Sequence, residues 1–305
     1  MNFSQYCTVG SRRGIVRGTV NDAGQAWRPQ SLEELSTAAI TTSVGDLELW
    51  FADLDAFTPW LSSAADMALL AEDERQRAAR MTAPSVREHF LLSRLLLRRV
   101  LGAYPALFGR RFEFAVSAHG KPFLVRPDDP SAVDVPHFNL SHCRGAWLLG
   151  VSRKAAIGVD IERPRRIDNA LRLATRVFTA AERAALLAAA ESAADGLAGN
   201  EVVGNEIDRH EIGDNAARLT DRDRLFLRCW TRKEAVLKAM GSGFALPAAD
   251  FEVSTSAMPL GVRLPEAAGT TATVDSLTLP VPGFAAWALL GTHDVPVPRL
   301  RWLKP

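Results

Sequence analysis

The sequence predicts an α+β fold, because its helices and strands do not alternate as regularly as those of a doubly wound parallel sheet. Two stretches, residues 85–104 and 221–240, have the length and apolar spacing of amphipathic helices. Between and after them, short apolar runs of strand length are separated by proline and glycine. The 305 residues are enough for about two lobes or one large fold.

Composition excludes several classes of protein. Hydrophobic residues make up 47% of the chain and charged residues 23%, which excludes a disordered chain, a collagen and a disulfide-rich miniprotein. A net charge of +1 gives no overall attraction to nucleic acid or to a membrane. No segment approaches the roughly 20 apolar residues of a membrane span, and the N-terminus lacks the apolar core of a secretory signal. Three scattered cysteines indicate a reducing compartment, so we expect a soluble cytoplasmic protein.

The first part of the chain is predicted to contain an extension, a strand and two helices. In order, these are residues 1–45, Leu47–Phe51, Asp66–Arg80 and Ser85–Tyr104. Proline at position 84 separates the two helices, and Ser85–Glu88 has the pattern of a capping box that opens the second.

The rest of the chain is predicted to contain further strands, two helices and an insertion. In order, these are strands at Phe112–Val116, Ala146–Ser152 and Ile157–Ile161, an alanine-rich helix opened by the capping box Thr179–Glu182, an insertion near 191–215, the helix 221–240 and short closing strands. The insertion contains seven acidic residues and one arginine, which is typical of a surface segment.

Arginine is concentrated on the second predicted helix and its flanks. Residues 75–111 contain nine arginines and a single acidic residue. At 100° per residue, Arg87, Arg94 and Arg98 fall within about 40° of one another. This pattern fits either a solvated polar face or an anion-binding stripe, and the sequence leaves both open.

Two carboxylates occur in the segment Gly158–Glu162. On a strand, Asp160 and Glu162 project from the same face about 7 Å apart along the chain, where they repel each other. A hard cation such as Mg²⁺ would remove that repulsion and bind the carboxylate oxygens. The alternative is a strand end with two solvated acids.

A further acid occurs beside a lysine on the later helix. Glu234 and Lys238 are four residues apart and therefore neighbours on the helix surface. Glu234 is only about 40° from Trp230, so its carboxylate borders the buried stripe. The alternative is an ordinary surface ion pair.

Ser141 and His142 form a third candidate pair, with Lys121 about twenty residues earlier in a turn at Gly120–Pro122. Adjacent residues on an extended segment point to opposite faces, so this serine and histidine are poorly placed to share a proton. A G-x-S-x-G elbow is absent, as are the nucleotide-binding glycine loops, H-E-x-x-H and paired CxxC. A histidine and a lysine that bind a phosphate are the better interpretation.

Taken in order, these motifs resemble the 4′-phosphopantetheinyl transferases, and more closely the large monomeric type that serves nonribosomal peptide and polyketide synthases. The motifs are GKP (120–122), FNLSH (138–142), GVDIE (158–162) and WTRKEAVLK (230–238). The resemblance covers residues 47–290 and implies two α+β lobes related by a pseudo-twofold axis, with coenzyme A in the cleft between them. We expect a monomer whose N-terminal lobe covers residues 46–155 and whose C-terminal lobe covers residues 156–305. The N-terminal extension and the insertion near 191–215 have no counterpart in the matched motifs.

The resemblance also implies roles for individual residues. Asp160, Glu162 and Glu234 would hold Mg²⁺ with the pyrophosphate of coenzyme A, and Lys238 would contact that pyrophosphate. His142, with Ser141 beside it, would bind the 3′-phosphate, and Lys121 would border the adenosine end. Arg87 is similar to a basic position before the long helix of the first lobe, where the local motif is loose. Of these, Asp160, Glu234 and Lys238 would be catalytic.

The implied reaction is attack by a serine hydroxyl of an apo acyl or peptidyl carrier protein on the β-phosphate of coenzyme A, with release of 3′,5′-ADP. A base must accept the serine proton. Glu234, directly or through a bound water, is the first candidate, and Lys233 beside the bound coenzyme A is the alternative.

The competing functions are a Mg²⁺-dependent hydrolase of coenzyme A and an inactive coenzyme A-binding module. The second would predict a missing acid, whereas all three acidic positions are filled.

Overall fold

The computed structural model describes residues 26–37, 47–109, 111–125, 135–196, 219–241, 246–256, 260–264, 270–291 and 296–305. Its elements confirm the α+β class. In chain order they are β1 (Arg28–Ser31), α1 (Glu34–Thr37), β2 (Leu47–Asp53), the 3₁₀ helix η1 (Leu54–Ser62), α2 (Ala64–Met67), α3 (Glu72–Ala79), α4 (Pro84–Gly102), β3 (Phe114–Val116), β4 (Pro122–Leu124), β5 (His137–Cys143), β6 (Ala146–Ser152), β7 (Ile157–Glu162), α5 (Ala170–Val177), α6 (Ala180–Gly196), α8 (Asp221–Met240), η3 (Ala248–Asp250), β8 (Leu260–Arg263), β9 (Thr271–Leu277), β10 (Phe284–Leu290) and β11 (Arg299–Lys304). Within the described ranges, no helix is both long enough and apolar enough to cross a bilayer.

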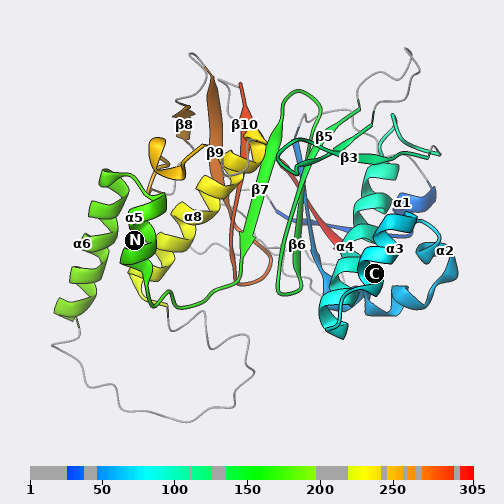
Figure 1. The fold of residues 1–305 in the computed structure, drawn as a ribbon, viewed down its shortest axis with the longest axis horizontal. Helices are drawn as coiled ribbons and strands as arrows, with labels where there is room; N and C mark the ends of the chain where they lie inside the picture. The colour runs from blue at the N-terminus through cyan, green and yellow to red at the C-terminus, as the bar shows by residue number, and fades with distance from the viewer. Residues whose placement is uncertain are drawn as a thin grey trace, which may run out of the picture.

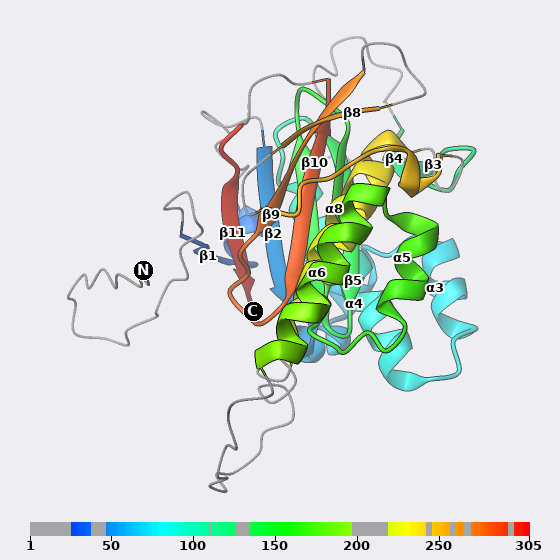
Figure 2. The ribbon, with the colours of Figure 1, turned by 90° about the vertical axis from the view of Figure 1, so that its left-hand side faces the viewer.

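Two sheets lie between two sets of helices (Figure 1). The first sheet has the strand order β1-β11-β2-β6-β5 and, together with α1–α4 and the β3–β4 hairpin, forms the first lobe. The second sheet has the order β7-β10-β9-β8 and, with α5, α6 and α8, forms the second lobe. Figure 2 shows these three helices in front of the strands. Each set of helices covers its own sheet, and the two sheets pack on each other through a third cluster of buried side chains.

The alternation expected for β2 is confirmed, and both of its faces are buried. Leu47, Leu49 and Phe51 pack toward the second sheet, whereas Trp50 packs toward α4. Glu48 lies on the same side as Trp50, because neighbours on a strand point to opposite faces. Its carboxylate is buried and accepts a hydrogen bond of 2.6 Å from the Tyr104 hydroxyl.

The lobe boundaries differ from those expected from the sequence, because the ends of the described chain meet in the first sheet. β11 pairs in parallel with both β1 and β2, although it follows the second lobe in the chain. Part of the expected extension is therefore structured: Trp27, Leu32 and Leu35 are buried against the first sheet and its helices. Pairing between strands so far apart in the chain leaves no local sequence pattern. The rest of the extension lies outside the described residues.

Two details of the predicted helices are corrected, and one is confirmed. The helix expected from Asp66 is divided into α2 and α3. The capping box at Ser85–Glu88 is wrong: α4 already begins at Pro84, whose fixed φ angle suits the first turn, and Ala83 is the N-cap. The capping box Thr179–Glu182 is confirmed, with reciprocal hydrogen bonds of 2.8 Å and 3.3 Å. Of the expected insertion, residues 191–196 extend α6, and the remainder lies outside the described residues.

Two glycines allow the close approaches on which the junction of the lobes depends. A Cβ atom on Gly150 would lie 2.5 Å from Ile157 Cδ1, so β6 and β7 could not approach as they do. A Cβ atom on Gly158 would lie 1.9 Å from the Ala235 carbonyl oxygen and 2.3 Å from the Ala239 nitrogen, both in the backbone of α8. Helix α8 therefore packs directly on the backbone of β7.

We predict that Gly158→Ala lowers the free energy of unfolding by about 3 kcal/mol, because the added methyl group forces α8 away from β7. Urea denaturation of the purified variant measures this. Gly261→Ala in β8 is the matched control: its Cβ would meet nothing within 4 Å, so we expect a change of no more than about 0.5 kcal/mol. Equal stability of the two variants would contradict the packing described for α8.

Candidate active site

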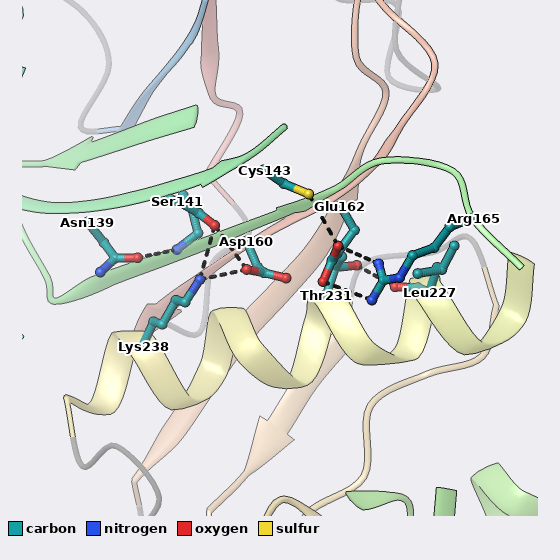
Figure 3. A network of polar contacts seen from close by, with 10 residues as sticks. Asn139, Ser141, Cys143, Asp160, Glu162, Arg165, Leu227, Thr231 and Lys238 are labelled. Carbon is teal, nitrogen blue, oxygen red and sulfur yellow. Dashed lines mark hydrogen bonds and ion pairs between the residues drawn. The ribbon is translucent and has the colours of Figure 1, made fainter. Parts of the chain in front are cut away.

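Three side chains from three elements meet where the lobes join (Figure 3). The Lys238 ammonium on α8 lies 2.6 Å from Oδ1 of Asp160 on β7. It also donates a hydrogen bond of 3.1 Å to the hydroxyl of Ser141 on β5. That hydroxyl in turn donates to the same aspartate oxygen at 3.0 Å. Asp160 is buried, whereas the Lys238 side chain is 29% exposed, so its charge can reach a molecule in solvent.

The start of α8 is fixed to the segment after β7 by hydrogen bonds of its first turn. At its start, the Thr220 side chain accepts a hydrogen bond from the Asp223 backbone, and Asp223 accepts one from the Ile167 backbone at 3.1 Å. This fixes the beginning of the helix to the segment after β7. One turn apart, Glu234 and Lys238 share the face that borders the strand.

Glu162 is two residues beyond Asp160 on β7, and cationic and thiol groups surround its carboxylate. The Arg165 guanidinium donates to Glu162 Oε2 at 2.7 Å and to Oε1 at 3.5 Å. The thiol of Cys143 lies 3.6 Å from Oε2, as Figure 3 also shows. Asp160 differs, because its Oδ2 atom is buried without a hydrogen-bond partner in the described structure. A buried carboxylate oxygen of this kind is a place where a cation would be stabilised.

The acids predicted to hold a metal are close enough to influence one another. Partial burial, together with the negative charges of Asp160 and Glu162, raises the pKa of Glu234, although Lys238 opposes this effect. As the side chains stand, no three or more histidine, cysteine, aspartate or glutamate residues of the described chain form a metal-binding group. Lys238 and Arg165 instead neutralise two of the three acids.

Ser141 and His142 point to opposite sides of β5, as expected. The serine is buried in the cluster with Asp160, and the histidine is exposed. Partial loss of hydration and the positive charges of Arg94, Lys238 and His89 lower the pKa of His142. The imidazole is therefore neutral near pH 7, with one N–H group available to donate to an anion.

Two arginines of α4 are paired with an acid and line a large cavity in the first lobe, so they do not form a stripe of unpaired cations. Arg98 donates to Glu74 Oε2 at 2.9 Å, and Arg94 Nε lies 3.8 Å from the other oxygen of the same carboxylate. Both arginines line a cavity of about 1080 Å³. Arg87 is exposed on the first turn of α4, and the described structure records no contact between it and the other predicted site residues.

Lys121 lies at the junction of the lobes and bonds to backbone atoms of the second lobe. Its ammonium donates to the carbonyl of Ile157 at 3.0 Å and to that of Ala239 at 2.9 Å. Burial lowers the pKa of Lys121 to about 8. Its position beside the adenosine end of coenzyme A stays a prediction, whereas its contacts with β7 and α8 are observed.

Lys233 is on a different face of α8 from Glu234, so the expectation that it lies near the cofactor or acts as the base is not supported by the structure. Its ammonium is buried 2.9 Å from Glu182 Oε2 and donates to the carbonyls of Ala248 and Phe251. The physical reason is the helical period: adjacent residues are about 100° apart, so Lys233 points into the core when Glu234 faces β7.

Three residues near the cluster were missed by the sequence analysis. Asn139 accepts the Val159 N–H at 2.9 Å and so joins β5 to β7. Its position two residues before Ser141 places it on the same strand face, which is a usable signal. Cys143 is two residues after Ser141 on β5 and has the same signal. Arg165 has none, because its contact with Glu162 depends on how the chain turns after β7.

Comparisons with known proteins place the chain beside one family. The family model of the 4′-phosphopantetheinyl transferase superfamily matches residues 156–274. The 4′-phosphopantetheinyl transferase HetI of Nostoc sp. is 30% identical over 206 residues, which cover 68% of this chain and 73% of that protein. A putative 4′-phosphopantetheinyl transferase of Synechocystis sp. is 30% identical over 178 residues, or 58% of this chain and 59% of that protein. The 4′-phosphopantetheinyl transferase ffp of Bacillus subtilis is 27% identical over 187 residues, or 61% and 67%.

The family model and the names of these relatives point to one class of group-transfer enzyme. With the similarity to HetI extending over most of both chains, this chain belongs to the 4′-phosphopantetheinyl transferase superfamily. The family expected from the order of the motifs is thereby confirmed.

We predict that Lys233→Met lowers the free energy of unfolding by about 3–5 kcal/mol, because it leaves the Glu182 carboxylate buried without its cation. Urea denaturation measures the loss. The double variant Lys233→Met/Glu182→Gln removes both charges and should regain part of the stability. A Lys233→Met protein of native stability that has lost all activity would instead assign this lysine to catalysis.

Proposed function

We propose that this enzyme transfers the 4′-phosphopantetheine group of coenzyme A to a serine hydroxyl of an apo carrier protein and releases 3′,5′-ADP. The observation that carries the proposal is the contact of Lys238 with Asp160 and Ser141 where the two lobes meet. Membership of the superfamily supports the class of reaction, and the names of the relatives state the same group transfer. We further propose acyl or peptidyl carrier domains of nonribosomal peptide or polyketide synthases as the acceptors.

The donor set near Lys238 fits Mg²⁺. Asp160 has a buried oxygen without a partner, and its neighbours Glu162 and Glu234 supply further carboxylate oxygens, the ligands that Mg²⁺ prefers. These three acids would hold the ion once Glu162 turns away from Arg165. When bound, Mg²⁺ would neutralise negative charge on the pyrophosphate of coenzyme A.

Lys238 would bind the pyrophosphate. Its side chain is 29% exposed, so the ammonium can keep its place beside Asp160 while it donates to a phosphate oxygen. A charge-assisted hydrogen bond of this kind is strong and becomes stronger as charge gathers on the leaving phosphate.

His142 and Arg94 would bind the 3′-phosphate. The two side chains are near enough for the arginine to lower the histidine pKa, and a phosphate between them would be attracted to both. Arg87, which is exposed in the first turn of α4, would add a more distant positive charge. Arg98 is less suited to this purpose, because its guanidinium already donates to the Glu74 carboxylate at 2.9 Å.

Glu234 would act as the base. Its carboxylate lies near Asp160, Glu162 and Lys238, and it could accept the proton directly or through a bound water. The serine hydroxyl of the carrier would transfer its proton to Glu234 as its oxygen bonds to the β-phosphorus. The bond from that phosphorus to the bridging oxygen would break, and this oxygen would leave with 3′,5′-ADP.

We also propose that the enzyme acts as a monomer in the cytoplasm. Both lobes and all the residues of the site belong to one chain, so the site needs no second copy. Cys143 and Cys229 are free thiols, which fits a reducing compartment.

We predict that an apo carrier domain incubated with the enzyme, coenzyme A and Mg²⁺ gains one phosphopantetheine group, measured as its intact mass. Asp160→Ala and a sample with EDTA should each lose this gain by at least about a hundredfold in rate, because both remove the cation site. Circular dichroism of the variant controls for folding.

Each other outcome of this assay assigns a different function. Cleavage of coenzyme A without modification of the carrier would identify a hydrolase. Binding of coenzyme A without modification of any of several carriers would identify a binding module. Full transfer in the presence of EDTA would contradict the proposed Mg²⁺ site but would leave the proposed group transfer intact.

A further inference from the structure

The Lys121 ammonium joins the two lobes at the point where α8 ends. It donates to the carbonyl of Ile157, the first residue of β7, and to the carbonyl of Ala239, in the last turn of α8. Lys121 belongs to the β3–β4 hairpin of the first lobe, and Figure 2 shows this hairpin beside the end of α8. One side chain therefore contacts both elements that carry the active-site acids.

The end of a helix is where such a contact has most effect. The last four carbonyl groups of a helix have no partner within it, and their partial negative charge is stabilised by a cation. Ala239 is one of these residues, and Gly241 after it has φ 68°, the left-handed conformation of a helix end. A Cβ atom on Gly241 would lie 3.0 Å from Lys121 Cδ, so the lysine stem fills the space that this glycine leaves.

The hairpin holds Lys121 in this position. The Ser117 N–H donates to the Lys121 carbonyl at 2.9 Å, and the Lys121 N–H donates to the Ser117 hydroxyl at 3.1 Å. Gly120 has φ 83°, which allows the tight turn just before the lysine. Among the described residues, no carboxylate forms an ion pair with Lys121, so backbone carbonyls are the recorded partners of its ammonium.

We propose that Lys121 is a positioning residue that fixes the last turn of α8 from the other lobe, and with it the adjacent Lys238. In this role its ammonium stays on the two carbonyls and does not serve as a ligand of coenzyme A. The structural half of this proposal stands on the contacts alone, whereas its effect on the reaction rests on the proposed function of Lys238.

Hydrogen–deuterium exchange of the enzyme without substrates tests the structural half. In Lys121→Met, which keeps the length of the stem and loses the charge, we expect the backbone amides of residues 238–241 to exchange about three- to tenfold faster. Lys121→Arg keeps a cation and should restore slow exchange. Ser117→Ala is the matched control: it weakens the same turn, leaves the ammonium in place and should leave these amides unchanged.

Kinetics and calorimetry then separate positioning from binding. If Lys121 positions Lys238, Lys121→Met should lower kcat about tenfold while the Kd for coenzyme A changes less than about threefold, and Lys121→Arg should recover most of kcat. Unchanged exchange together with a tenfold weaker Kd and a normal kcat would overturn the proposal and make Lys121 a ligand. If the wild-type enzyme modifies no carrier, the proposed function fails, and the exchange data still decide whether Lys121 fixes α8.

Discussion

The direct packing of α8 on β7 is the constraint on which the rest of the site depends. Because Gly158 has no side chain, the backbone of the helix can lie against the backbone of the strand. Glu234 and Lys238 are thereby brought beside Asp160, which a larger residue at position 158 would prevent. Gly150 has the same effect between β6 and β7, so the site lies at a junction made possible by two missing side chains.

The electrostatics of the site follow from this packing. Burial, together with the negative charges of Asp160 and Glu162, raises the pKa of Glu234, so the three acids do not ionise independently. Lys238 and Arg165 reduce the repulsion by pairing with Asp160 and Glu162. A divalent cation would compete with Arg165 for the Glu162 carboxylate, so its affinity depends on how readily Arg165 releases Glu162. The Arg165 guanidinium would then become available to another anion.

Local patterns in the sequence predicted the two long helices, several strands and the positions of the acids on them, but not the partners of these side chains. The period of α8 and the alternation of β7 placed Glu234 and Lys238 on one face and Asp160 and Glu162 on another. The same helical period, had it been applied to Lys233, would have placed that residue in the core. By contrast, the contacts of Lys121 with Ala239 and of β11 with β2 join segments more than 100 residues apart, and no local rule predicts them.

The most direct test of the account is a double-mutant cycle on kcat/KM for carrier modification, with Asp160→Asn, Lys238→Met and the double variant. If the two side chains act as one unit at the junction, the double variant should be about as slow as the slower single variant. Rate losses that simply multiply in the double variant would contradict the coupling of Asp160 and Lys238 on which the proposed site rests.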